Sequence, residues 1–262
     1  MESVGVSAGI VDLNPDALPV WVNRGYQSTT RISVDGLTGL IKGSAAIDLP
    51  NAIAGGIAPS SAVVGSFAFA APLLGAGTEA VSIVVELKFD GAFKVDAGSP
   101  FLNLVGTVAA GSSSIYSSSL SFWQANQADG VQIETYAEDE NGTPYAGASP
   151  LVLSSTPDAL AGIARVSFQA RPGEIVAFST SLMGISMAGY DGSSGWLASA
   201  GSVDFLHTGA LRILVPQGYG LDSDVPLLQS VVQVVPEPDA ALLLALGLAA
   251  LALRRDRKPQ RK

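Results

Sequence analysis

Residues 81–89 read Val-Ser-Ile-Val-Val-Glu-Leu-Lys-Phe. The odd positions from Val81 to Phe89 are all apolar, whereas positions 82, 86 and 88 are polar. Successive side chains of a β-strand point to opposite faces, so this pattern indicates a strand with one buried and one wet face. The stretch therefore predicts an antiparallel sheet that covers a core on one side.

The rest of the body repeats segments of this kind. Short runs rich in β-branched and aromatic residues are separated by Gly, Pro, Ser and Asn, and almost no segment between residues 20 and 235 has helical periodicity. We expect strands at Thr30–Val34, Gly39–Ile47, Ala62–Ala70, Ala80–Phe89, Phe101–Val108, Ser114–Trp123, Val131–Tyr136, Ile163–Ala170, Ile175–Ile185, Val203–Leu206, Leu211–Val215 and Leu228–Val235. The predicted fold class is all-β: an antiparallel β-sandwich of the jelly-roll or Ig-like kind.

Three dipeptides are typical of the tight turns between antiparallel strands. Asp90-Gly91, Asp129-Gly130 and Asn141-Gly142 each stand between strand-like runs. Glycine enters the left-handed backbone region without steric cost, so each dipeptide predicts a hairpin turn.

Composition narrows the possible functions. Only 14% of the 262 residues are charged and none is cysteine, which excludes disulfides and thiolate catalysis. Residues 1–253 hold 8 basic and 22 acidic side chains, a net charge of −14. A body this acidic repels nucleic acid, so we expect no nucleic-acid partner.

Residues that could carry catalysis are sparse. His207 is the only histidine, and the near-match to a nucleophile motif at Gly184–Ala188 lies in a strand-like run with no helix after it. We therefore predict that the protein is not an enzyme and uses no cofactor. A secreted hydrolase with Glu134 and Glu138 as paired carboxylates is the weaker alternative.

Two further groups of side chains are candidates for binding. Glu138 and Glu140 are weak metal candidates, because their spacing does not match a calcium loop and suits a solvated strand edge and turn. Trp21, Trp123 and Trp196 have faces that suit sugar rings, although filling the core is the competing interpretation. They motivate a carbohydrate-binding or adhesive module as the alternative function.

The C-terminal tail has three parts. Pro236-Glu237-Pro238 comes first, the uncharged run Ala240–Leu253 follows, and a basic end closes the chain. Two prolines keep the tripeptide extended, which is the form that a processing enzyme can bind. The basic end contains Arg254, Arg255, Arg257, Lys258, Arg261 and Lys262.

The run 240–253 contains only Ala, Leu and one Gly, so we expect a short hydrophobic helix in lipid. It would span roughly 21 Å, less than the hydrocarbon core of about 30 Å. A helix this short fits a transient inner-membrane anchor. The cations favour a cytoplasmic C-terminus, with the body on the far side of the membrane.

The tail resembles the PEP-CTERM sorting signal of Gram-negative bacteria, on Val235-Pro236-Glu237-Pro238, the run through Leu253 and Arg254-Arg255. The resemblance implies an exported protein that is recognised by exosortase, a membrane protease-transpeptidase, and associated with exopolysaccharide and biofilm production. The same region is also labelled an ice-binding protein C-terminal domain, which describes the tail and does not predict ice binding. Residues 200–219 resemble, more loosely, the last strands of such bodies.

We divide the chain into a body at 1–222, a stalk at 223–235 and the sorting signal at 236–262, with the basic tail at 254–262. The predicted protein acts at the cell surface or in the biofilm matrix. Its expected partners are exosortase, the inner membrane through 240–253, and exopolysaccharide. The first residues contain no basic and apolar leader, so we expect an upstream start or a longer parent protein.

Overall fold

The computed structural model describes residues 5–12, 26–36, 38–54, 58–125, 130–206, 209–225, 228 and 232–234, with the backbone alone at 5–12 and 232–234. Within these residues the fold is all-β with antiparallel sheets, as the sequence predicts. One pairing, between β15 and β17, is parallel. The predicted helix at 240–253 lies outside the described residues.

Two large sheets make up the body. Sheet A has seven strands, in the order β1 (Gly5–Asp12), β4 (Ser60–Leu74), β11 (Ile175–Met187), β6 (Phe101–Gly111), β7 (Ile115–Gln124) and β8 (Gln132–Asp139), with β16 (Gly220–Leu221) paired to the end of β4. Sheet B has eight strands: β2 (Gln27–Asp35), β3 (Leu40–Leu49), β14 (Ser199–Asp204), β15 (Gly209–Pro216), β5 (Val81–Ala97), β10 (Ala159–Ala170), β9 (Leu151–Ser155) and β17 (Val232–Val234).

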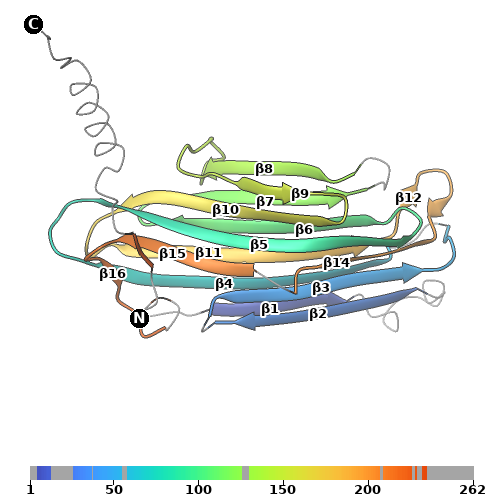
Figure 1. Ribbon diagram of the computed structural model, residues 1–262, viewed down its shortest axis with the longest axis horizontal. Coiled ribbons are helices and arrows are strands. Elements are labelled where there is room, and N and C mark those ends of the chain that lie inside the picture. Colours follow the sequence, from blue (N-terminus) through green and yellow to red (C-terminus); the bar gives the residue numbers. More distant parts are fainter. Residues whose placement is uncertain are drawn as a thin grey trace, which may run out of the picture.

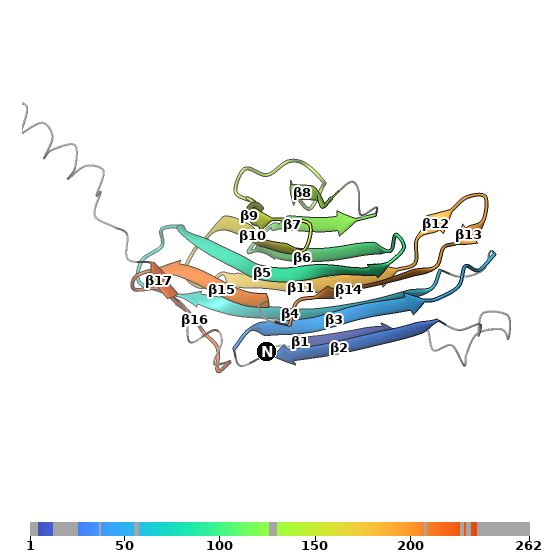
Figure 2. The ribbon, with the colours of Figure 1, turned by 45° about the vertical axis from the view of Figure 1, so that its right-hand side comes forward.

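A short hairpin of β12 (Tyr190–Asp191) and β13 (Gly195–Trp196) lies at one end of the body, and β16 and β17 lie at the other (Figures 1 and 2). Along the long sides, β1 and β2 form one edge and β8 and β9 form the other (Figure 1). The two ends of the body are therefore built from different parts of the chain.

The chain pairs its strands in a nested order. β14 and β15 lie end to end between β3 and β5, so they act as one long strand. β3 pairs with this line, β4 with β11, β5 with β10, and β6 with β7. Four early strands thus meet four later ones in reverse sequence order, and successive pairs alternate between sheet B and sheet A.

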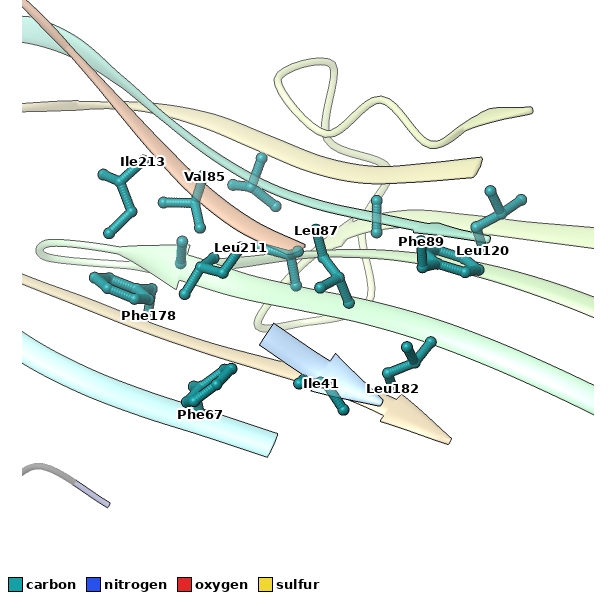
Figure 3. Close-up of a cluster of buried hydrophobic side chains, with 14 of the residues drawn as sticks. Ile41, Phe67, Val85, Leu87, Phe89, Leu120, Phe178, Leu182, Leu211 and Ile213 are labelled. Atoms are coloured by element: carbon teal, nitrogen blue, oxygen red, sulfur yellow. The ribbon is translucent and has the colours of Figure 1, made fainter. Parts of the chain in front are cut away.

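The sheets face each other across one core, because the buried positions alternate along every long strand of the nested pairs. Figure 3 shows side chains from both sheets in this core, including Phe67 and Phe178 of sheet A and Val85 and Leu211 of sheet B. Burying an aliphatic or aromatic side chain of this size stabilises the fold by about 1.5–3 kcal/mol. The alternation of buried and more exposed positions seen at residues 81–89 is thus found in the other long strands of the body as well.

Phe205 joins the two sheets where β14 passes into β15. Its ring is 1% exposed and lies between Gly43 of sheet B and Gly184 of sheet A. A Cβ at Gly43 would lie 2.6 Å from Phe205 Cζ, and one at Gly184 would lie 2.7 Å from Phe205 Cε1. The two glycines are therefore needed to make room for the ring.

The predicted turn at Asp90-Gly91 is wrong, because β5 continues through it. The β14–β15 line is interrupted opposite this dipeptide, since Asp204 faces Ala92 and Gly209 faces Phe89. A Cβ at Gly91 would lie 2.9 Å from the Asp204 carbonyl oxygen and 2.7 Å from Leu104 Cδ2. Close packing, and not a turn, explains this glycine.

The glycines of the two other predicted turns adopt the left-handed backbone conformation. Gly130 has a φ of 67° before β8, and Gly142 has a φ of 75° after it. Each predicted strand overlaps an observed one, but the sequence interpretation missed β1, β9 and the two-residue strands β12, β13 and β16.

Candidate functional site

The predicted sorting motif starts two residues after the last described strand. β17 ends at Val234, which lies opposite Pro216 of β15. Leu228 is only 2% exposed, and Val225 packs against the core. The described part of the segment that we predict as a stalk at 223–235 therefore lies against the body, while the domain boundaries stay a prediction.

The motif residues themselves lie outside the described residues. These are Pro236, Glu237 and Pro238, the apolar run 240–253, and the basic residues Arg254, Arg255, Arg257 and Lys258. Among the residues that are described, no helix is long and apolar enough to cross a membrane. Their predicted roles depend on their order in the sequence.

β15, the strand with which β17 pairs, contacts β5 through an ion pair as well as through backbone hydrogen bonds. Glu86 of β5 is 8% exposed and lies between two arginines of adjacent strands. Arg165 Nε is 3.4 Å from Glu86 Oε1, and Arg212 Nη1 of β15 is 3.9 Å from Glu86 Oε2. Two cations therefore compensate one largely buried carboxylate, which would be costly to bury alone.

The acidic turn after β8 is organised by Asp139. Its Oδ1 accepts the backbone N–H groups of Thr143 and Asn141, each at 2.9 Å. These two bonds, that of Thr143 foremost, lower the pKa of the Asp139 carboxyl. The arrangement is that of a turn whose carboxylate satisfies backbone donors.

The weak metal candidates flank this turn. Glu138 lies opposite Ser117 on β7, and Glu140 Oε2 accepts the N–H of Ile115 at 3.5 Å. Within the described part of the chain, no group of three His, Cys, Asp or Glu side chains could hold a metal ion. The structure thus places both glutamates at a strand edge and turn.

The carboxylates considered for a hydrolase do not converge. Glu134 and Glu138 lie on the same strand, opposite Ser121 and Ser117 of β7. Because they are four residues apart on an extended strand, their Cα atoms are about 13 Å apart. The two carboxyl groups of a glycosidase lie about 5–9.5 Å apart. The register therefore gives no support to this pair as the acid and base of a glycosidase.

The serine of the near-match to a nucleophile motif is part of the core. Ser186 is buried in β11, and its hydroxyl donates to the carbonyl of Gly201 at 2.9 Å. A nucleophile would need an exposed hydroxyl at a strand-to-helix turn. His207 lies outside the described residues.

The tryptophans belong to separate aromatic pairs. Trp123 stacks on Phe101 on the outer face of sheet A, with ring centroids 6.1 Å apart. Trp196 of the β12–β13 hairpin lies 4.7 Å from Tyr190, and Trp21 lies outside the described residues. Each pair offers part of an aromatic surface of its own.

Two acidic pockets formed by strands of sheet B were missed by sequence reasoning. The larger, of about 460 Å³, is lined by Asp90 and Asp204 together with Ser154, Leu160, Phe205 and small residues of β5 and β10. The smaller, of about 290 Å³, has Asp48 and Asp96 in its wall. No local motif signals either pocket, because the residues come from separate strands that only the sheet brings together.

Comparison with known proteins identifies the tail. The family model of the PEP-CTERM protein-sorting motif matches residues 234–258, which contain the Pro-Glu-Pro tripeptide, the apolar run and the first basic residues. The resemblance expected from the sequence is confirmed. This motif implies an exported protein that is processed by exosortase. Comparison with curated proteins found none that matches the chain.

Proposed function

We propose that this protein is a non-enzymatic component of the cell surface or of the exopolysaccharide and biofilm matrix, which exosortase sorts and cleaves. The observation that carries the proposal is the sorting motif at 234–258, which begins at the last residue of β17. In the described residues the candidate catalytic side chains do not converge: Ser186 is buried, and Glu134 and Glu138 lie far apart along one strand.

The body suits a structural or adhesive role. We infer that it is a jelly-roll sandwich, because its eight long strands pair in nested order and alternate between two sheets. Its acidic character keeps it soluble once the basic tail has been removed. Fold alone does not define a ligand, so the matrix role rests on the tail and on the absence of convergent catalytic groups among the described residues.

The proposed sequence of events follows from the order of the segments. The run 240–253 holds the exported chain in the inner membrane with Arg254 and Arg255 on the cytoplasmic side. Exosortase then binds the extended Pro236-Glu237-Pro238 segment and cuts the chain. The released body keeps β17 and reaches the cell surface or the matrix, where exopolysaccharide is the proposed partner.

Exosortase-dependent processing is the direct test. An epitope tag at Gly77 would not disturb the core, because Gly77 lies in the β4–β5 connection and a Cβ added there would meet no atom within 4 Å. The tagged chain, given a working export signal, is expressed in a host with exosortase and in the same host without it. We expect a shortened, extracellular tagged product in the first host alone.

Point variants of the motif make the test specific. Glu237→Ala and Pro238→Ala should leave the chain uncut, whereas Glu174→Ala, an acidic change in the body, should be processed normally. Tagged protein that stays cytosolic and full-length in the exosortase host would overturn the proposal.

The second candidate is a carbohydrate-binding module, supported by the Phe101–Trp123 pair on the outer face of sheet A. Aromatic faces stack on sugar rings, and lectins are among the proteins with this fold. Retention of the released body on isolated matrix polysaccharide, lost in Trp123→Ala and kept in Trp196→Ala, would support it. Equal retention of both variants would rule out this surface.

A further inference from the structure

The outer face of sheet A has no charge on its central strands. None of the residues of β4, β11, β6 and β7 is Asp, Glu, Lys or Arg. On β4 the odd positions from Val63 to Leu73 point into the core or close against it, so the even positions from Ala62 to Leu74 point outward. The four strands therefore present a broad neutral surface, although the body as a whole is strongly acidic.

Large apolar side chains gather at one end of this surface, which we call the apolar end. The strand register places Val64, Met183 and Val105 in one row across β4, β11 and β6. The next rows add Ile185 beside Asn103, and then Met187 beside Phe101. Trp123 completes the apolar end, because it lies opposite Asn103 and stacks on Phe101.

A band of hydroxyl groups crosses the middle of the same surface. Ser181 of β11, Thr107 of β6 and Ser119 of β7 are neighbours in register, and the hydroxyls of Thr107 and Ser119 lie 3.3 Å apart. Beyond the band the surface is apolar again, with Ile175 51% and Leu74 49% exposed. Along the strands the surface is therefore apolar at one end, carries hydroxyl groups in the middle and is apolar at the other end, so its two ends are alike.

The area of this surface suits a stable protein interface. Four strands of 10 to 15 residues at the usual spacing and rise cover about 750 Å². A standard interface buries about 800 Å² on each partner. Interface centres are also poor in charge and rich in aromatic residues and Met, and this surface carries Phe101, Trp123, Met183 and Met187.

We propose that the outer face of sheet A is the interface of a homodimer, in which two copies of the chain pack their neutral faces together. A partner that buries this face must itself be neutral there, because an unpaired charge is costly to remove from water. The chain's own face meets that requirement, and its pattern permits a two-fold axis that brings hydroxyls onto hydroxyls and apolar ends onto apolar ends. Packed face to face, two such sheets lie about 10 Å apart.

Matched charge insertions on the two outer faces test the proposal. Ser181→Asp places a carboxylate in the hydroxyl band, whereas Ser44→Asp places one at an equally half-exposed, outward position of β3 in sheet B. The full chain is studied by sedimentation equilibrium in a nonionic detergent that solubilises the tail. We expect the native chain and Ser44→Asp to dimerise alike, and Ser181→Asp to weaken the dimer by at least about 10-fold.

Cross-linking gives a second, positional measurement. The chain has no cysteine, so Thr107→Cys and Ser44→Cys each introduce one thiol, and a bismaleimide should link Thr107→Cys alone. Thermal melts of each variant separate loss of the dimer from loss of the fold.

Three results would overturn the homodimer. One is a native chain that stays monomeric at every concentration. Another is a dimer equally strong in Ser181→Asp and Ser44→Asp, which would place the contact on the tail or elsewhere. The third is a monomer whose neutral face binds matrix polysaccharide. None of these results depends on exosortase, so they leave the sorting test unaffected.

Discussion

The two outer faces of the molecule differ sharply, although their inner faces are built alike. Both sheets bury mostly apolar side chains in one core at alternate strand positions. Outside, the central strands of sheet A carry no charge, whereas sheet B carries Arg31, Asp35, Lys42, Asp48, Glu86, Lys88, Asp90, Lys94, Asp96, Arg165, Asp204 and Arg212. The inward half of each strand thus specifies the fold, and the outward half is free to differ for function.

Replacing the residue that joins the two inner faces should have the largest effect. Phe205→Ala removes a fully buried ring that lies between both sheets. We expect a loss of about 3–5 kcal/mol in the free energy of unfolding, measured by chemical denaturation. Tyr190→Ala, at a position 60% exposed, should cost about 0.5 kcal/mol or less. Similar losses in the two variants would contradict this account of the core.

Adding a methyl group on either side of the same ring tests whether the inner faces are equivalent. Gly43→Ala in sheet B and Gly184→Ala in sheet A should each cost about 1–3 kcal/mol through overpacking. Part of each loss should be recovered when Phe205→Leu is added, because the smaller side chain relieves the clash. If only one of the two variants loses stability, the Phe205 ring packs closely against that sheet alone.

The charged face of sheet B should respond to salt in a way that depends on burial. Glu86→Gln removes the carboxylate between Arg165 and Arg212 and should cost about 1 kcal/mol at low salt, with a smaller cost at high salt. Lys94→Gln is the matched change, because Lys94 and Asp96 form an exposed pair at 2.6 Å. That variant should cost about 0.5 kcal/mol or less. Equal costs would mean that burial of Glu86 adds nothing.

The smallest expected effect concerns Asp139, which ends β8 at the edge of sheet A and begins the acidic turn. Backbone N–H bonds from Thr143 and Asn141 lower the pKa of Asp139 below its ordinary 3.8. The contribution of this carboxylate to stability is therefore present above pH 3.8 and disappears as the pH falls through the lower, folded-state pKa. NMR titration of the Asp139 carboxyl measures this pKa directly.

A charge-neutral variant checks the cause. Asp139→Asn should lose that part of the pH dependence of unfolding, while Glu134→Gln on the same strand removes a charge without removing the turn bonds. If Asp139 titrates at its ordinary value, the turn bonds do not act on the charge as we expect.

The architecture could largely be predicted from the sequence, because alternation is a local signal. The alternation at residues 81–89 predicts a strand there, but it does not predict that the strand extends to Ala97. Asp90-Gly91 has the composition of a turn, but β5 continues because β14 and β15 pair with it on either side of this dipeptide. β9 was missed because five residues ending in Ser154-Ser155 carry too little pattern.

The functional features, too, could be predicted only where their residues are contiguous in the sequence. The tail could be identified because a sorting signal is read as a linear segment, and the match at 234–258 confirms it. The neutral face and the two acidic pockets could not, since their residues become neighbours only through strand register. Phe205 gave no sequence signal either, because its two glycines lie far from it in the chain, at Gly43 and Gly184.

The parallel pairing of β17 with β15 places the start of the sorting signal at one defined end of the body. The β14–β15 line runs from beside the β12–β13 hairpin, at Ser199, to beside β17, at Pro216, and covers roughly 50 Å. In the membrane-anchored state that we propose, the end that bears β17 is the one nearest the bilayer. The hairpin, whose Tyr190 is 60% exposed, then lies farthest from the lipid.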